Sequence, residues 1–505
     1  MKKLFRTFLM AAMAAAVVLS CDKEPNPTPT PSGETDPATK PENKALMTAQ
    51  KFLRDDIMKT YYYWYRSVPD LQPDYKTDIY KYFDKLLWTG DAQHPYGDYW
   101  SWMMDGQEYI AEESGIQSGT FGASLGQPWM DLTDYFEDDY NIVVRYVYPN
   151  SPFDKAGVTR GCVLTNLDGK SVQGYYLSSN AHLQEFDKIV NYPSTTEYHV
   201  FEFKTPSGET ISKSMLAAET LNTRPGLIKK IFTAEDYPGL TQPVGYFHYL
   251  AFKADDDANG KSMMDDITEA MAYFKANNVK TLILDLRYNG GGDSRASDKL
   301  VSYLAPKSAN GEVYVKRTHN DKLKSEDKEQ KVECPADSPE FNKLYFITGR
   351  GSASASEMSL NGLKPLANVK HVGDTTYGKP NGMYVFYYPG DNASYAQYDK
   401  GNFKKLKYVF LPICFYNANG LGENIPDDGM IPDVTIPDDL YHDFDASEMN
   451  IAACLYDIVH GSFPDIPKHK TSASRKVHKD KLMMFKSEED SNEKYGTYIV
   501  KPDFL

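Results

Sequence analysis

This chain of 505 residues has fewer positively than negatively charged side chains. Lys and Arg together number 55 against 70 Asp and Glu, which gives a formal net charge of −15 at pH 7. Proteins that bind nucleic acid carry basic patches that neutralise phosphates, so a chain this acidic is a poor candidate for that class, and we expect no nucleic-acid partner. Aromatic residues, at 13%, are plentiful enough to argue against wholesale disorder.

Cysteine is rare, with five in the chain. Cys162, Cys334, Cys414 and Cys454 lie far apart and form no C-x-x-C pair, so the spacing argues against a zinc site, and we expect no metal. An exported protein could pair these four cysteines as disulfides, or they could remain buried thiols; the sequence leaves both interpretations open.

Long apolar runs are also absent beyond the N-terminus. The first segment, MKKLFRTFLMAAMAAAVVLSC, has basic residues before a short apolar run, which is the layout of a signal peptide over residues 1–20. Its end resembles a bacterial lipobox, which implies that Cys21 is lipidated; an ordinary signal peptide with a chance cysteine is the alternative. We therefore expect a protein of the bacterial cell envelope, anchored to a membrane by lipid, on the periplasmic face or at the cell surface.

Composition divides the rest of the chain. Residues 21–44 are polar with six prolines, which predicts an extended tether. Helical spacing of apolar residues predicts an N-terminal helical domain over 45–112. We interpret its aromatic run, Tyr61–Tyr65, as packing between helices, with sugar binding as the alternative. Residues 461–505 are charged, and we expect a mobile or loosely docked tail.

Residues 113–220 carry β signals. NIVVRYVYP reads as a strand, NSPFDKAGV as a turn and short helix with Gly157 at a left-handed stop, and CVLTNLDGKSV as two strand segments joined at Asp168–Gly169. This ordered set resembles a PDZ domain of the bacterial protease type, and SGTFGASLG resembles its carboxylate-binding loop. The resemblance implies a module that binds peptide C-termini by strand addition. A generic β-module is the alternative.

Residues 221–460 alternate apolar strands with amphipathic helices, which predicts an α/β domain whose sheet is covered on both faces. One strand ends in LDLRYNGGGDS, where three glycines let the backbone approach a ligand and present N–H groups. No G-K-[ST] follows and the spacing is wrong for a dinucleotide loop, so an oxyanion site fits better than a phosphate site.

The segment GRGSASASEMSLNG follows the predicted strand KLYFIT. Ser354 and Glu357 have capping-box spacing, so a purely structural interpretation is available. The same geometry points the Ser354 hydroxyl outward beside free N–H groups at a helix start, where the Ala355 N–H could share an oxyanion with the glycine loop. Lys379, in GDTTYGKPNG, serves as a base only if desolvation lowers its pKa; a solvated surface lysine is the alternative.

Together these features, in this order behind a PDZ-like module, resemble the tail-specific or C-terminal processing peptidases, which are serine proteases with a Ser–Lys dyad. The resemblance covers about residues 115–440, including GMIPDVTI near the end. It implies Ser354 as nucleophile and Lys379, twenty-five residues on, as base. It also suggests Gly291 as the oxyanion donor beside Ala355, with Gly290 or Gly292 as alternatives. Ser352 and Ser356 are expected to shape the turn.

The chain departs from the family's pattern at two positions. Some members have a third polar residue where this chain has Pro365, and others have Gln where it has Met383. Glu357 is the remaining candidate to orient Lys379, unless it only caps the helix. None of the ten histidines falls in the motif, so a Ser-His-Asp triad is not supported.

The expected fold is α+β and multidomain: a helical N-terminal region, a PDZ-like β-rich domain and an α/β core like that of Clp protease and crotonase. The expected function is a serine endopeptidase that hydrolyses exported polypeptides, binds them through their C-terminal residues and needs no metal or organic cofactor. Two alternatives stay open: a non-catalytic peptide- or ligand-binding lipoprotein on the same core, and a surface glycan-binding lipoprotein.

Overall fold

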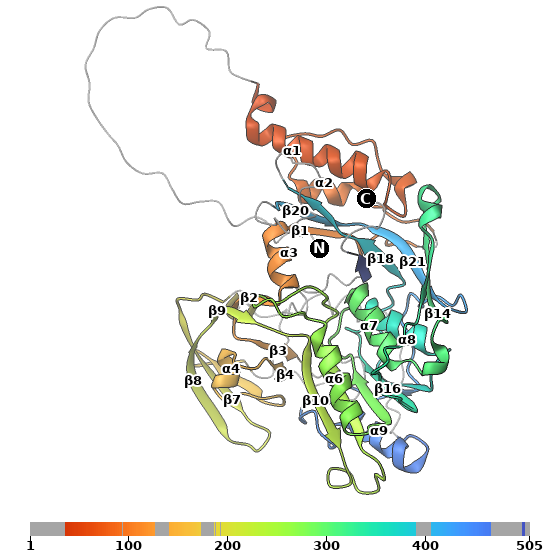
Figure 1. Cartoon of the computed structure of the whole chain (residues 1–505). Coiled ribbons are helices and arrows are strands. Elements are labelled where there is room, and N and C mark those ends of the chain that lie inside the picture. Colours follow the sequence, from red (N-terminus) through yellow and green to blue (C-terminus); the bar gives the residue numbers. More distant parts are fainter. Residues whose placement is uncertain are drawn as a thin grey trace, which may run out of the picture.

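The computed structural model is shown in Figure 1. The predicted signal peptide and the predicted lipidation site at Cys21 lie outside the residues that it describes. Within the described residues, no helix has the length and apolar character needed to span a bilayer. The structure describes residues 36–92, 94–126, 141–172, 186, 188–191, 193–389, 406–465 and 497–499.

A six-stranded sheet forms the centre of the predicted α/β region. Its first pair, β10 and β11, is antiparallel, and every later pair is parallel. The strands, in spatial order, are β10 (Gly226–Phe232), β11 (Val244–Tyr249), β12 (Thr281–Asp285), β16 (Lys343–Thr348), β17 (Val369–Gly373) and β22 (Val434–Thr435).

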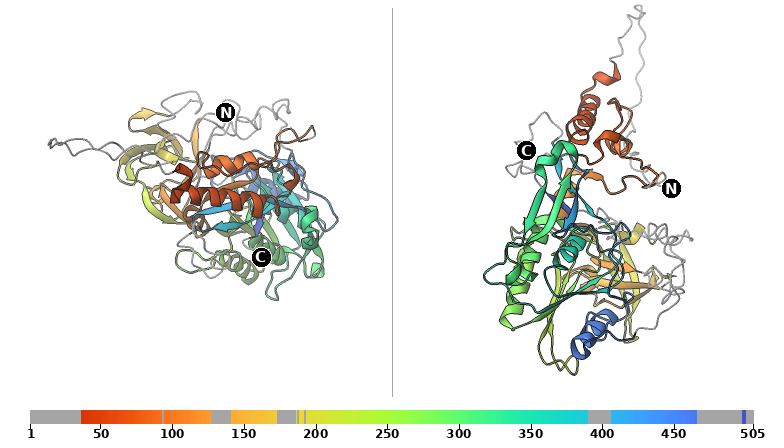
Figure 2. Two further views of the ribbon diagram at one scale, coloured as in Figure 1. Left: turned by 90° about the horizontal axis from the view of Figure 1, so that it is seen from above. Right: turned by 90° about the vertical axis from the view of Figure 1, so that its right-hand side faces the viewer.

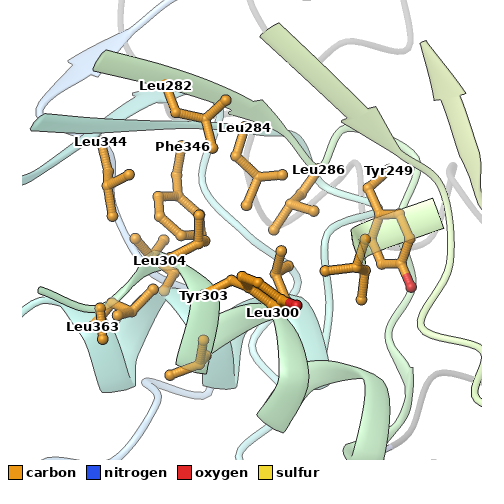
Figure 3. Packing of buried hydrophobic residues seen from close by; sticks show 14 of the residues in the cluster. Tyr249, Leu282, Leu284, Leu286, Leu300, Tyr303, Leu304, Leu344, Phe346 and Leu363 are labelled. Atoms are coloured by element: carbon orange, nitrogen blue, oxygen red, sulfur yellow. The ribbon is translucent and has the colours of Figure 1, made fainter. Parts of the chain in front are cut away.

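Helices cover both faces of this sheet, as the continuous apolar strands predict. On one face, Leu282 and Leu284 of β12 pack with residues of three helices; Figure 3 shows them pointing toward Leu300 and Leu304. On the other face, Ile283 packs with the last helix. The three helices are α6 (Asp265–Ala276), α7 (Ser294–Leu304) and α8 (Ala355–Leu363), and the last is α9 (Met449–His460).

A second six-stranded sheet lies beside α7 and α8. Of the expected tail, the structure describes 461–465 and 497–499, and the latter forms a strand inside this sheet, which the sequence does not predict. In spatial order the strands are β13 (Gly292–Asp293), β23 (Thr497–Ile499), β18 (Asn381–Tyr384), β21 (Ile413–Asn419), β14 (Val313–His319) and β15 (Lys328–Lys331). Short 3-10 helices Lys307–Ala309 and Asp321–Glu326 flank β14.

The N-terminal helices do not form a core of their own. They share one hydrophobic cluster with the strands between Met383 and Phe415, so the expected domain over 45–112 is packed as part of a larger unit. In Figure 2 they lie at the opposite end of the molecule from α9. This region contains the 3-10 helices Pro37–Thr39 and Tyr65–Ser67, α1 (Pro41–Phe52), the π-helix Leu53–Met58, α2 (Ile79–Leu86), α3 (Gly106–Glu113), and a sheet of β1 (Trp102–Asp105), β20 (Tyr408–Leu411) and β19 (Phe386–Tyr388).

Two expectations for this region are settled by its packing. The first long helix begins at Pro41, inside the expected tether, because proline at the first helical position loses no hydrogen bond. The aromatic run packs as interpreted, although against strands and another aromatic ring rather than between helices. Tyr63 contacts Tyr416 of β21 with ring centroids 4.7 Å apart, and Trp64 stacks on Trp88 at 4.9 Å.

The β-rich region contains the elements that the sequence predicts. Gly157 has φ +82°, and Asp168 and Gly169 both have positive φ in a tight turn. A separate cluster of phenylalanines, including Phe153 and Phe201, forms its core. The elements are β2 (Ile116–Thr120) paired with β9 (Ala218–Asn222), the sheet β3 (Ala123–Gly126), β4 (Ile142–Val147), β5 (Val163–Leu167), β7 (Tyr198–Lys204) and β8 (Thr210–Leu216), the short β6 (Lys170–Ser171) and helix α4 (Pro152–Lys155).

The four cysteines of the described chain are free thiols, which settles the choice left open by the sequence. Cys162, Cys414 and Cys454 are buried, and Cys334 is half-buried. Burial raises the pKa of Cys414 and Cys454, so these thiols behave as small apolar core residues rather than as nucleophiles.

Candidate active site

Ser354 lies where the chain turns from strand β16 into helix α8. It occupies the N-cap position in a left-handed backbone conformation, with φ +54° and ψ −106°. A non-glycine residue with positive φ is uncommon and is retained only where its surroundings fix it. The strand, turn and helix start predicted from the sequence are thus confirmed, and Ser354 is in addition the strained residue of the turn.

The neighbouring serines tie this turn to the glycine loop. Ser352 Oγ donates a hydrogen bond to the Leu286 carbonyl at 2.7 Å and accepts one from the Gly349 N–H at 3.0 Å. Ser356 Oγ donates to the Asn289 carbonyl at 2.8 Å. The expectation that Ser352 and Ser356 shape the turn is therefore confirmed: both bind the chain that leads into the three glycines.

The glycine loop touches the serine turn directly. Gly291 has φ +107°, and a Cβ added to it would lie 3.0 Å from Ser354 Cβ and 3.0 Å from the Ala355 nitrogen. A side chain at Gly291 would therefore fill the space beside the Ala355 N–H, which is where an oxyanion would have to sit. The loop and the helix start meet as the oxyanion hypothesis requires.

The identity of the loop's N–H donor needs correction. The Gly291 N–H, expected to bind the oxyanion, donates to Asn289 Oδ1 at 2.9 Å and is thus already engaged in this conformation. Gly290 was one of the alternatives, and no residue in the described ranges accepts a hydrogen bond from its N–H. The loop therefore offers Gly290 at once, or Gly291 after its bond to Asn289 is released.

Lys379 is the second predicted catalytic residue, and it is deeply buried. It lies in the segment that connects β17 to β18 and is 1% exposed. Among the described residues, its Nζ has no hydrogen-bond partner. Desolvation lowers the pKa of Lys379 from 10.5 to about 7, while the charges of Asp98 and Glu357 oppose this shift. The alternative of a solvated surface lysine is therefore excluded, and a large fraction of the amine is neutral at pH 7.

Glu357 joins the two halves of the site. Its Oε2 accepts hydrogen bonds from the N–H groups of Ser354 at 2.8 Å and of Lys379 at 2.9 Å. Its Oε1 accepts from Thr376 Oγ1 at 2.5 Å and from the Gly378 N–H at 2.7 Å. One buried carboxylate thus holds the backbones of both predicted catalytic residues on a single oxygen atom.

This arrangement decides between the two interpretations of Glu357. It forms a capping box with Ser354, as its spacing predicts, but it also reaches twenty-two residues ahead to the lysine turn. It fixes the main chain of Lys379 rather than the Nζ atom, which has no partner in the described chain. Burial raises the pKa of Glu357, and the four donated hydrogen bonds oppose this shift because they favour the carboxylate.

Asp98 is a site residue that sequence reasoning missed. It is 7% exposed and accepts hydrogen bonds from Tyr62 Oη at 2.7 Å and from Ser101 Oγ at 2.5 Å. Ser101 Oγ in turn accepts from the Ile413 N–H at 2.8 Å, and Ile413 pairs with Met383 in β18, four residues after Lys379. The N-terminal region therefore supplies a carboxylate close to Lys379, with no motif in the sequence to announce it.

The structure thus brings the predicted residues together but leaves one contact unmade. Ser354, Lys379, Ala355 and Gly291 all meet around the Glu357 carboxylate and the glycine loop. Lys379 Nζ forms no hydrogen bond within the described residues, so the Ser–Lys hydrogen bond is not present in this conformation. Catalytic hydrogen bonds often tighten only when substrate binds, so this geometry is compatible with the predicted dyad.

Metal ligation has no support in the described part of the chain, where no group of three or more His, Cys, Asp or Glu is arranged to hold an ion. The two departures from the family pattern lie on different elements. Met383 is fully buried in β18, and Pro365 follows the end of α8.

Comparisons with known proteins show similarity to one family of peptidases. Residues 243–405 match the model of peptidase family S41. The carboxyl-terminal-processing peptidase 2, chloroplastic, of Arabidopsis thaliana is 23% identical over 274 residues, which are 54% of this chain and 48% of that protein. The carboxy-terminal processing protease CtpB of Bacillus subtilis (strain 168) is 21% identical over 249 residues, which are 48% of this chain and 45% of that protein. The chain spans about half the length of the curated relatives it matches.

One solved structure extends the likeness to most of the chain. A protein of Bacteroides fragilis NCTC 9343, assigned to the S41 proteases, superimposes with a TM-score of 0.60 at 20% identity, covering 80% of this chain and 96% of that one. This likeness shows a shared mixed α/β fold. Residues 243–405 are thus similar to peptidase family S41, and about half of the chain is similar to C-terminal processing peptidases.

Proposed function

We propose that this protein is a serine endopeptidase that cleaves polypeptides with a Ser354–Lys379 dyad. The observation that carries the proposal is the Glu357 carboxylate, whose one oxygen accepts the N–H groups of both residues. A capping residue needs to bind only its own helix start. The additional bond to Lys379 is explained if the two turns must keep a fixed geometry for chemistry.

The reaction follows from the positions of these groups. Ser354 Oγ attacks the peptide carbonyl carbon while neutral Lys379 Nζ takes the hydroxyl proton. The Ala355 N–H and a donor of the glycine loop stabilise the oxyanion. When the C–N bond breaks, Lys379 gives the proton to the leaving amine and an acyl-serine remains. Water then attacks the acyl carbon while Lys379 accepts its proton; the acyl–Oγ bond breaks, the carboxylic acid leaves, and Lys379 returns the proton to Ser354 Oγ.

The wider roles expected from the sequence become part of this proposal. The β-rich module of residues 113–220 would bind the C-terminal residues of the substrate, with the turn between β2 and β3 receiving the carboxylate. Lipid on Cys21 would hold the enzyme to a membrane of the cell envelope. The module is attached to the core by Arg160, which is 3% exposed and pairs with Asp438 at 3.0 Å.

The rival glycan-binding function was suggested by the lipobox and the aromatic excess, and the packing of the aromatic run Tyr61–Tyr65 does not favour it. Tyr62 is fully buried, and its hydroxyl donates to Asp98. Trp64 is stacked on Trp88, so its ring is already used in packing. The other rival, a non-catalytic binding protein, is distinguished from a peptidase by the cleavage and labelling test described next.

The test compares the purified protein with its Ser354→Ala variant on an unfolded protein substrate and with a fluorophosphonate probe. Cleavage and labelling should both disappear with Ser354→Ala. A Ser325→Ala variant, which changes an exposed serine in the turn Asp321–Glu326, should retain both. Labelling of Ser354→Ala equal to that of the parent would reject Ser354 as nucleophile. Absence of cleavage and labelling in the parent protein would favour the non-catalytic binding protein.

A further inference from the structure

The strand β23 occupies a distinctive place in the second sheet. Thr497–Ile499 is flanked on both sides by parallel neighbours, with Thr497 opposite Gly292 of β13 and opposite Gly382 of β18. In Figure 1 it is the short dark-blue strand beside β18. A segment far along the chain therefore completes a sheet whose other strands come from residues 292–419.

The two neighbours of β23 carry the two halves of the candidate active site. β13 begins directly after Gly291, which lies against the Ser354 turn. β18 begins two residues after Lys379. The slot between β13 and β18 thus runs from the glycine loop on one side to the lysine turn on the other, and Thr497–Ile499 lies in it.

The slot presents main-chain groups on both of its sides. Strand β13 offers its edge to β23, and β18 offers the edge opposite its pairing with β21, so an inserted segment can form ladder hydrogen bonds on both sides. The residues level with Thr497 are glycines on both strands, Gly292 and Gly382, so neither neighbour adds a side chain there. From the next residue on, both neighbours carry side chains, with Asp293 and Met383 opposite Tyr498.

We propose that the slot between β13 and β18 is the groove that binds the substrate polypeptide, and that Thr497–Ile499 is a built-in competitor that occupies it. This inference rests on the proposed peptidase function. The ligand class is an extended polypeptide backbone added as a strand in parallel with both neighbours. Substrate enters only when the protein's own strand leaves, so the protein is autoinhibited.

A competitor on the same chain acts at a fixed effective concentration, which does not change when the protein is diluted. It reduces the fraction of protein able to bind substrate and therefore raises the apparent KM without changing kcat. If the strand is in place about nine-tenths of the time, releasing it lowers the apparent KM about tenfold.

The kinetic test uses the full chain with Tyr498→Pro and the matched control Tyr498→Ala. Proline removes one ladder N–H from the strand, whereas alanine retains it. We expect the apparent KM for an unfolded protein to fall about tenfold in Tyr498→Pro, with kcat unchanged and Tyr498→Ala close to the parent protein. Equal KM values in the two variants, with cleavage still dependent on Ser354, would overturn the inference and leave the proposed function standing.

A second measurement does not depend on activity. Hydrogen exchange of the β18 amides, Asn381–Tyr384, should be faster in Tyr498→Pro than in Tyr498→Ala, and a synthetic peptide containing GTYIV should restore protection when added in excess. Equal exchange in the two variants would overturn occupancy of the slot. Failure of both the parent and Tyr498→Pro to cleave, with exchange changed as expected, would instead reject the peptidase function and with it the competition.

Discussion

Replacing Lys379 by methionine should stabilise the folded protein while abolishing cleavage. The amine is 1% exposed and has no hydrogen-bond partner in the described chain, and burial lowers its pKa from 10.5 to about 7. Methionine has a similar length and no charge to desolvate. A residue retained for stability would not lie in such a site, so the substitution separates catalytic from structural roles.

The magnitude follows from linkage between protonation and folding. Between pH 7 and 10.5 the unfolded chain binds a proton at Lys379 that the folded protein does not, so stability decreases as the pH falls through this window. At about 1.4 kcal/mol per pKa unit, the penalty is about 5 kcal/mol at low pH and about 4 kcal/mol at pH 7. Lys379→Met should therefore gain about 4 kcal/mol at pH 7, and the gain should vanish near pH 10.5.

The assay is urea unfolding of the parent and Lys379→Met at several pH values from 6 to 10.5, with the cleavage rate followed over the same range. The matched control is Lys370→Met, which removes a lysine that donates to the buried carboxylate of Asp457 at 2.8 Å and should lose stability. Cleavage by the parent should rise with pH through about 7, as Lys379 becomes neutral. A Lys379→Met protein that is less stable at pH 7, or a difference that does not change with pH, would refute the reasoning.

Three further substitutions test the rest of the site. In Glu357→Gln, an amide NH₂ group can replace an oxygen that now accepts N–H groups, so a hydrogen bond is lost. Urea unfolding should show a stability loss of about 2–4 kcal/mol, and cleavage should be lost. A stability equal to that of the parent would contradict the bridging role. Asp98→Asn removes a charge that raises the pKa of Lys379, so the acid limb of the pH–rate profile should move to lower pH, and an unmoved limb would exclude Asp98 as a tuning group. Gly291→Ala adds a Cβ 3.0 Å from Ser354 Cβ in a left-handed conformation, so kcat should fall by about 10²–10³-fold while fluorophosphonate binding weakens; unchanged kcat would place the oxyanion elsewhere.

Local signals in the sequence are sufficient to predict most of the central fold. The continuous apolar strand ending at Asp285 and the capping-box spacing of Ser354 and Glu357 are both confirmed. These features succeed because each depends on neighbours within one element: period, cap and turn chemistry. The tight turn at Asp168–Gly169 is predicted for the same reason.

Contacts between segments far apart in the chain could not be predicted from the sequence. Asp98 is tied to β21 through Ser101, whose hydroxyl accepts the Ile413 N–H, and nothing near Asp98 in the sequence signals this contact. Thr497–Ile499 looks like part of a charged tail, because a three-residue strand has no period and its pairing partners lie more than a hundred residues away. The N-terminal helices likewise find their core in strands around residue 410.

Burial and two nearby carboxylates, Asp98 and Glu357, together set the pKa of Lys379 near 7. Burial is the largest influence on the pKa of Lys379 and lowers it, whereas the negative charges of Asp98 and Glu357 both raise it. A base works best when its pKa is near the working pH, because a lower value weakens the base and a higher value leaves it protonated.

Glu357 can stand beside the lysine without pairing with it because its oxygens are already bound by the N–H groups of Ser354, Gly378 and Lys379 and by the Thr376 hydroxyl. A carboxylate with free lone pairs would instead form an ion pair with Lys379 and hold it protonated. The four hydrogen bonds to Glu357 therefore have two effects. They fix the geometry of the two turns, and they keep the neighbouring amine available as a base.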